Sequence, residues 1–179
     1  MNAITANSTW TVEVDSGFNP GKTVVLEINA DSPISAVHIC MKVGMHSDFE
    51  FVTIVRGDCE WLGLLRTGCT GEGSITNDVV VNLLERGTLL RVDSIHIDRD
   101  SQVVAGTISS GSEMTKSDLR YRMGQPGGNL NVLGSILSAE EMMLDHHIEI
   151  HHDAPETFSR LDWHSACGGK SKTVGTGML

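Results

Sequence analysis

Short strand-like segments follow one another along almost the whole chain, each separated from the next by a tight turn. Glycine, asparagine, aspartate and serine fill the turns, as in DSGFNPG and TGCTGEG, because these residues accept the backbone angles of tight turns. One further segment, SAEEMMLDHH at 138–147, has the composition of a short helical turn. The alternation of β-branched and other apolar residues predicts strands at 9–15, 22–29, 34–43, 49–55, 60–66, 77–84, 88–98, 101–109, 117–123, 129–137 and 146–152. The sequence therefore predicts an all-β protein.

The composition of these segments narrows the architecture. Aromatic residues make up only 4% of the chain, so valine, isoleucine, leucine and methionine must fill the core. Several segments, such as TVVLEI and AVHICMKV, are apolar on both of the faces that a strand presents. Stacked coils with a narrow interior accommodate such segments well, so we expect a parallel β-helix. A β-sandwich or a cupin-like barrel is the alternative.

Internal similarity agrees with a repeated unit. Residues 29–39, 84–97 and 125–137 each read as a turn, a strand, a small residue and then an apolar pair. The last two copies are offset by about 40 residues, which lies within the range of known repeat units. In this alignment His38 and His96 occupy equivalent positions.

The length and the net charge of the chain limit the classes of function that it can have. The 179 residues, of which 40% are hydrophobic, suffice for one domain with its own core, and we assign 1–179 to a single domain. The formal net charge of −10 argues against binding to nucleic acid or to an anionic membrane surface. No apolar run is long enough to span a bilayer, and the first 15 residues lack the basic and apolar blocks of a signal peptide. We therefore expect a cytoplasmic protein.

Four of the eight histidines lie within the seven residues HHIEIHH at 146–152. If this stretch is a strand, alternate residues face opposite ways, and the two isoleucines, Ile148 and Ile150, mark the core side. His146 and His152 share that side, which brings His152 inward at the end of the strand. The opposite, outer side then carries Asp145, His147, Glu149, His151 and Asp153.

Three interpretations of the outer row are open. It is a solvated strand face, a metal site, or a source of a general base. Neutral imidazole and carboxylate suit zinc or iron, but side chains two residues apart on a strand are roughly 7 Å apart. A metal site would therefore need ligands from another strand or another subunit. The general base is the weakest interpretation, because no nucleophile motif accompanies the row.

The four cysteines are Cys40, Cys59, Cys69 and Cys167, and they form neither a CxxC pair nor a zinc-finger spacing. Each is most simply a small buried apolar side chain. Cys167 differs because it lies in HSACGGKSK, a glycine-rich turn in which a thiol is expected to be exposed.

The C-terminal third resembles the core domain of SufB and SufD, the iron–sulfur cluster assembly proteins. That core has an aspartate near the start of a strand, a histidine further on, then His-x-x-Pro and a serine four residues later. The resemblance is clear over about 130–179, where GKSKTVGTG at 169–177 matches the turn and strand that follow the motif. It implies a right-handed parallel β-helix. The positions that match the family motif are Asp145, His147, His152, Pro155 and Ser159.

The resemblance implies a non-enzymatic scaffold or accessory protein that acts by protein–protein assembly, with itself or with another SufB/SufD-like subunit. The sequence lacks the family's C-terminal helical region, which puts docking of a SufC-type ATPase in doubt. Cluster ligands are usually thiolates, and only Cys167 lies near the histidine row in sequence. An iron–sulfur cluster would therefore have to be shared between subunits, and its tentative metal ligands here are His147, Glu149, His151 and Cys167.

Two other functions remain open on the residues alone. One is a metal-dependent enzyme with a barrel fold, which would use the His147, Glu149 and His151 row together with His38 or His96. The other is a purely structural module whose sheets bind a partner through edge pairing. Metal content and turnover of a substrate would separate these two from the scaffold.

Overall fold

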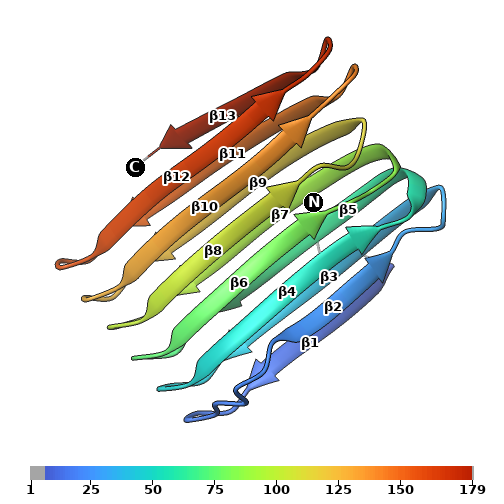
Figure 1. Cartoon of the computed structure of the whole chain (residues 1–179). Coiled ribbons are helices and arrows are strands. Elements are labelled where there is room, and N and C mark those ends of the chain that lie inside the picture. The colour runs from blue at the N-terminus through green and yellow to red at the C-terminus, as the bar shows by residue number, and fades with distance from the viewer. Residues whose placement is uncertain (1–6, 179) are drawn as a thin grey trace.

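The computed structural model describes residues 7–178, which contain thirteen strands and no helix (Figure 1). Residues 1–6, part of the N-terminus that was interpreted as lacking a signal peptide, lie outside the described residues, as does residue 179. Within the described range no helix could cross a membrane. The strands are β1 (Ser8–Val14), β2 (Val24–Asn29), β3 (Ile34–Val43), β4 (Asp48–Arg56), β5 (Asp58–Cys69), β6 (Ile75–Asn82), β7 (Arg86–Ile97), β8 (Gln102–Ser109), β9 (Met114–Met123), β10 (Asn129–Ser138), β11 (Met143–His152), β12 (Phe158–Cys167) and β13 (Lys172–Met178).

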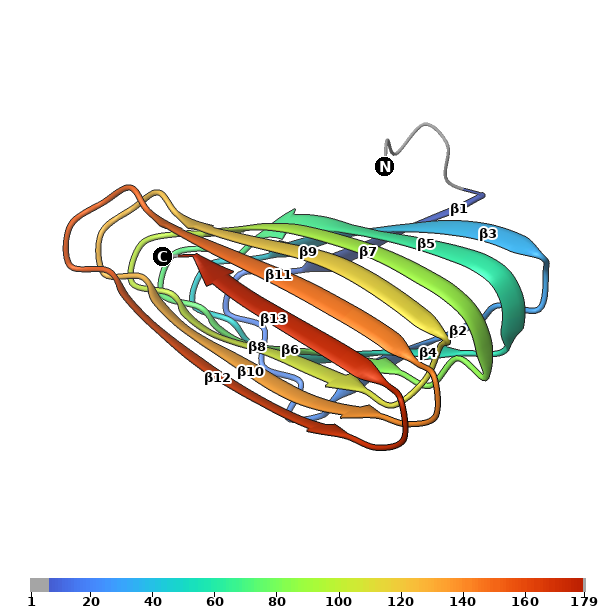
Figure 2. The same cartoon turned by 90° about the horizontal axis from the view of Figure 1, so that it is seen from above.

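The strands build two sheets that face each other along a solenoid of about six turns (Figures 1 and 2). The odd-numbered strands form a seven-stranded sheet, here called sheet A, in the order β1-β3-β5-β7-β9-β11-β13. The even-numbered strands form a six-stranded sheet, sheet B, in the order β12-β10-β8-β6-β4-β2. Every neighbouring pair is parallel. The predicted parallel β-helix is confirmed, and the sandwich and barrel alternatives are wrong.

One coil is shorter than the repeat predicted from the sequence. Thr88 pairs with Met114 and Ser8 pairs with Val37, so equivalent residues lie 26 to 29 positions apart. The offset of about 40 residues compared β7 of sheet A with β10 of sheet B, two strands that resemble each other only because both alternate.

The alignment of 29–39 with 84–97 contains a second error, which concerns two histidines. His38 pairs with Leu65, which pairs with Val92, so the position equivalent to His38 in β7 is Val92 and not His96. The apparent equivalence of His38 and His96 is therefore wrong by four residues. Both histidines do lie on the outer face of sheet A.

The eleven strands expected from alternation all form, with ends that differ by a few residues. The helical turn expected at 138–147 does not form. Instead β10 ends at Ser138, a turn follows, and β11 begins at Met143. Alternation continues through Leu144, His146 and Ile148, whose burial in the interior outweighs the local helical composition.

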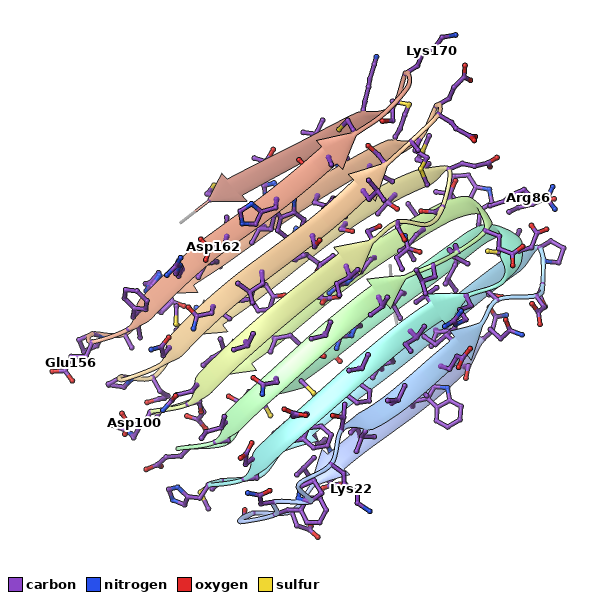
Figure 3. The ribbon with its side chains drawn as sticks, in the orientation of Figure 1. Lys22, Arg86, Asp100, Glu156, Asp162 and Lys170 are labelled. Carbon is purple, nitrogen blue, oxygen red and sulfur yellow. The ribbon has the colours of Figure 1, made fainter. Side chains whose placement is uncertain are left out.

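The turns stack at two edges of the solenoid. At one edge a residue with positive φ recurs once per coil, at Gly17, His46, Gly73, Asp100, Gly127 and Glu156. At the other edge Gly87 permits a close approach, because a Cβ on Gly87 would lie 1.8 Å from the carbonyl oxygen of Cys59. Lys22, Asp100 and Glu156 mark the first edge in Figure 3, and Arg86 and Lys170 mark the second. The edges are therefore lined by charged turn residues.

The interior is apolar at both ends of the solenoid and polar between them. One apolar cluster extends from β1 to β7 and includes Phe49 and Phe51, whose rings stack with centroids 6.0 Å apart. The second extends from β7 to β11 and includes Leu119 and Ile148. Where one cluster gives way to the other, β5, β6 and β7 place charged residues inside.

Candidate functional site

Strand β11 carries the histidine row, and its two faces are as predicted. Ile148 and Ile150 are buried, and His146 is buried beside them. His147 and Glu149 are half-buried on the outer face of sheet A. The alternation of β11 therefore decides which histidines can meet a ligand from outside.

The neighbouring strand β9 supplies the partners of this outer row. Parallel register places Asp118 beside His147 and Arg120 beside Glu149. Arg120 donates to both carboxylate oxygens of Asp118, at 3.0 and 2.7 Å, and lies 3.3 Å from Glu149 Oε2. His151 Nε2 lies 3.0 Å from Glu149 Oε1. We call this set, Asp118, Arg120, His147, Glu149 and His151, the outer charge cluster.

Three members of the outer charge cluster lie near enough to one another to be considered as ligands of one metal ion. One ligand atom from each of Asp118, His147 and Glu149 lies within 4.8 Å of the other two. The expectation that ligands must come from more than one strand thus agrees with this geometry. Asp118 was missed because the sequence does not show which residue of β9 lies beside His147. The sequence did show that Asp118, Arg120 and Arg122 alternate in SDLRYRM, which places three charged side chains on one face of that strand.

Cys167 does not join the histidine row. It is the last residue of β12 rather than part of the following turn, so it belongs to sheet B, whereas His147 lies on the outer face of sheet A. Hydrogen bonds with Ser138 and then with Thr173 lower the pKa of the exposed Cys167 thiol. Within one chain, the four tentative ligands therefore do not meet, because Cys167 lies on sheet B and His147, Glu149 and His151 lie on sheet A.

The other cysteines vary in exposure. Cys59 is buried, and burial followed by the charge of Asp58 raises the pKa of its thiol. Cys40 is half-buried and Cys69 is exposed. The expectation of a small buried side chain therefore holds for Cys59 but not for Cys69, and the exposure expected for Cys167 is confirmed.

The five family-motif residues separate into two places. Asp145 lies on the outer face of β11, where it pairs with Lys116, and His147 lies on the same face. His152 lies at the end of β11, Pro155 in the turn, and Ser159 at the start of β12. The motif therefore contributes both to the outer row and to a turn.

Hydrogen bonds join the two sides of that turn. The His152 ring bonds through Nδ1 to Thr157 Oγ1 and through Nε2 to Ser159 Oγ, each at 2.8 Å. His152 has the inward parity that was predicted but remains exposed, because its ring faces the turn and not the core. This part of the motif fixes the passage from sheet A to sheet B.

His146 and Trp163 form a second histidine site, inside the solenoid. Their ring centroids are 5.2 Å apart, and neither ring nitrogen of His146 has a hydrogen-bond partner within the protein. Gly134 makes room for the indole, because a Cβ there would lie 2.2 Å from Trp163 Cε3. Burial, followed by the charge of Arg91, lowers the pKa of His146 to about 4, although Asp145 opposes the shift. His146 is therefore neutral at pH 7.

A third group of charges is enclosed between the sheets. Arg66 donates to Asp78 at 2.5 Å and to Asp93 at 3.0 Å, and Arg91 donates to Asp93 at 2.6 and 3.0 Å. Each of these side chains is at most 6% exposed. Burial alone raises the pKa of Asp93, but Arg91 and then Arg66 outweigh burial and lower it. We call Arg66, Asp78, Arg91 and Asp93 the buried quartet; the sequence did not predict it.

A hollow of about 680 Å³ lies at the edge of the solenoid, against the first residues of β5 and β7 and the turns before β3 and β9. Its lining includes Trp61 and Arg86, and Arg86 is paired with Asp58. Further carboxylates come from Asp31, Glu60 and Glu113. The hollow is acidic and open, and none of the residues singled out as site candidates lines it.

Comparison with known proteins gives one match. The family model described as "SUF system FeS cluster assembly, SufBD core domain" matches residues 26–179. The match extends the resemblance, which the sequence analysis found over 130–179, to the last part of β2 and all later strands. Neither the curated proteins nor the solved structures gave a match.

Proposed function

Because the chain belongs to the SufBD core-domain family of the SUF system for iron–sulfur cluster assembly, we propose that it is a non-enzymatic scaffold or accessory protein of cluster assembly in the cytoplasm. It acts by pairing with a second SufBD-type solenoid, either another copy of itself or a SufB/SufD-like subunit. The observation that carries this proposal is the family match, which spans both sheets and includes the motif from Asp145 to Ser159.

The outer face of sheet B supports a role in assembly. Val25, Ile108, Leu133 and Leu137 point outward from this face and are 41 to 57% exposed. The register places Val25, Val52, Val79, Gly106 and Leu133 in one row across five strands. An exposed apolar row of this kind is typical of protein–protein contact. The charges at its rim already pair within the chain, as Arg160 does with Asp162.

A cluster handled as cargo would need ligands from more than one chain. Cluster irons are usually held by four thiolates, with histidine as an occasional substitute. Here Cys59 is buried, Cys40 and Cys69 lie on sheet A, and Cys167 lies on sheet B. Among the described residues, one chain therefore does not offer four converging thiolates. In this proposal the second solenoid supplies the remaining cluster ligands.

The first experiment is anaerobic purification followed by measurement of mass, iron, zinc and acid-labile sulfide. We expect a dimer, or a complex with a SufB/SufD-like subunit, that acquires iron and sulfide in equal amounts. A monomer that acquires neither in the presence of such a subunit would contradict the proposal.

A pair of matched variants locates the contact. Leu133→Glu on the outer face of sheet B should abolish pairing, because it places a charge in the apolar row. Leu90→Glu, at 37% exposure against 41% for Leu133, makes the same change on the outer face of sheet A and should leave pairing intact. Equal effects of the two variants would rule out the outer face of sheet B as the contact.

A further inference from the structure

We propose that Asp118, His147 and Glu149 form a divalent-metal site on the outer face of sheet A, which takes a first-row ion such as Zn²⁺ in competition with Arg120. This inference does not depend on the proposed function, because it uses only the geometry of β9 and β11.

The backbone brings the three ligands together. Asp118 and His147 are register partners on adjacent parallel strands, and Glu149 follows His147 on the same face. Their ligand atoms lie within 4.8 Å of one another, whereas two ligands around one zinc ion are roughly 3–3.5 Å apart, given metal–ligand distances near 2.1 Å. The proposal therefore requires the three side chains to rotate toward one another.

Arg120 now occupies the position of a cation. Its guanidinium contacts both Asp118 and Glu149 and thereby balances two carboxylates that would otherwise repel each other. The side chain of Arg120 is 54% exposed, whereas Glu149 is 18% exposed. Exposed ion pairs contribute little to stability, so Arg120 can turn into solvent while the less mobile carboxylates remain.

His151 adds a positioning contact. Its Nε2 lies 3.0 Å from Glu149 Oε1, which leaves Oε2 on the side of Arg120. Groups that hold a ligand in this way commonly affect metal affinity by about 10- to 100-fold. The structure thus supplies an oriented carboxylate and not merely a nearby one.

The ligand set indicates the kind of ion. One imidazole with two carboxylates is a borderline set, which favours Zn²⁺, Fe²⁺ or Mn²⁺ over Ca²⁺ and Mg²⁺. Among the three, zinc binds most tightly in the general order of affinities. Three protein ligands leave at least one coordination position open to solvent or to a ligand from a partner.

The test is a titration of the full chain with Zn²⁺ against a chromogenic chelator. We expect one zinc ion per chain in the wild type, with affinity reduced more than tenfold in Asp118→Asn and in His147→Ala. Arg120→Met should tighten binding about fivefold, because it removes the competing cation of an exposed pair. His96→Ala, on the same outer face but outside the site, is the matched control and should have no effect. Circular dichroism and thermal unfolding verify that each variant is folded.

Co²⁺ gives a second readout that separates this site from the cysteines. Bound at the proposed site, Co²⁺ should show visible d–d bands without the near-ultraviolet band of a cobalt–thiolate bond. Absence of zinc binding in the wild type would overturn the proposal. So would equal affinities in the wild type, Asp118→Asn and His147→Ala, or a thiolate band, since these results would locate the metal elsewhere.

Discussion

The molecule contains two clusters of arginine and carboxylate that are built alike and placed in opposite environments. The buried quartet lies between the sheets on β5, β6 and β7, whereas the outer charge cluster lies on the solvent side of β9 and β11. Arg66 is 3% exposed at its side chain, and Arg120 is 54% exposed. The two clusters contain the same kinds of charged residue but differ in burial. Burial therefore decides whether such ion pairs are a fixed part of the core or can be replaced by contacts with a bound ion.

The buried quartet should be the more sensitive of the two. Asp93→Asn removes the charge that Arg66 and Arg91 share and leaves a guanidinium uncompensated inside the protein. We expect a loss of about 3–5 kcal/mol in the free energy of unfolding, measured by urea denaturation at pH 7. Asp145→Asn is the matched control, because Asp145 pairs with Lys116 at the surface and should cost no more than about 1 kcal/mol. Similar losses of stability in Asp93→Asn and Asp145→Asn would contradict the distinction between buried and exposed ion pairs.

His146 extends the comparison to pH. Its pKa of about 4 in the folded protein lies below the value of about 6.5 for an exposed histidine, so the unfolded chain binds more protons between these values. Stability should therefore fall as pH falls from 6.5 to 4, by up to about 3 kcal/mol in total. The pKa of Asp93 is held below its ordinary value, so its own contribution is lost only at still lower pH.

Urea denaturation across pH 4 to 7.5 measures this effect. His146→Leu replaces the ring by an apolar side chain and should flatten the decline. His147→Leu on the outer face is the control and should leave the decline in place. If stability falls with pH in His146→Leu as it does in the wild type, His146 is not the source of the decline.

Packing inside the solenoid gives a smaller effect. Gly134→Ala places a methyl group against the indole of Trp163, and overpacking of this kind costs about 1–3 kcal/mol. Gly124→Ala introduces the same methyl group where a Cβ would meet nothing within 4 Å. Thermal unfolding of the two variants should show a lower midpoint for Gly134→Ala alone.

The smallest effect is expected at the outer charge cluster itself. Arg120→Met should change the free energy of unfolding by less than about 1 kcal/mol, because exposed ion pairs are weak and screened by salt. Any difference from the wild type should shrink when urea denaturation is repeated at high salt. A loss as large as that of Asp93→Asn would mean that Arg120 is structural and not displaceable.

Sequence reasoning succeeded where one strand decides the answer and failed where two strands must be aligned. The buried Ile148 and the outer His147 followed from alternation within β11, since side chains have a period of two. Asp118 could not be placed beside His147, because register is a relation between strands.

The buried quartet was not predicted from the sequence for a related reason. In TLLRVDSIHID both faces mix apolar and charged residues, so alternation does not reveal that Arg91 and Asp93 point inward while Leu90 and Val92 point outward. Only the position of Arg66 on the adjacent strand, in register with Asp93, makes their burial favourable. A charge inside a solenoid is predictable only together with its partner.

Nuclear magnetic resonance of the histidine ring nitrogens, followed through pH and through zinc addition, tests the inside–outside distinction most directly. Single-histidine variants provide the assignments. We predict that the His146 ring stays neutral until the pH approaches 4 and does not respond to zinc at pH 7, whereas a ring nitrogen of His147 shifts on addition of one equivalent of zinc. Titration of His146 near pH 6.5, or a zinc response at His146 without one at His147, would contradict the account.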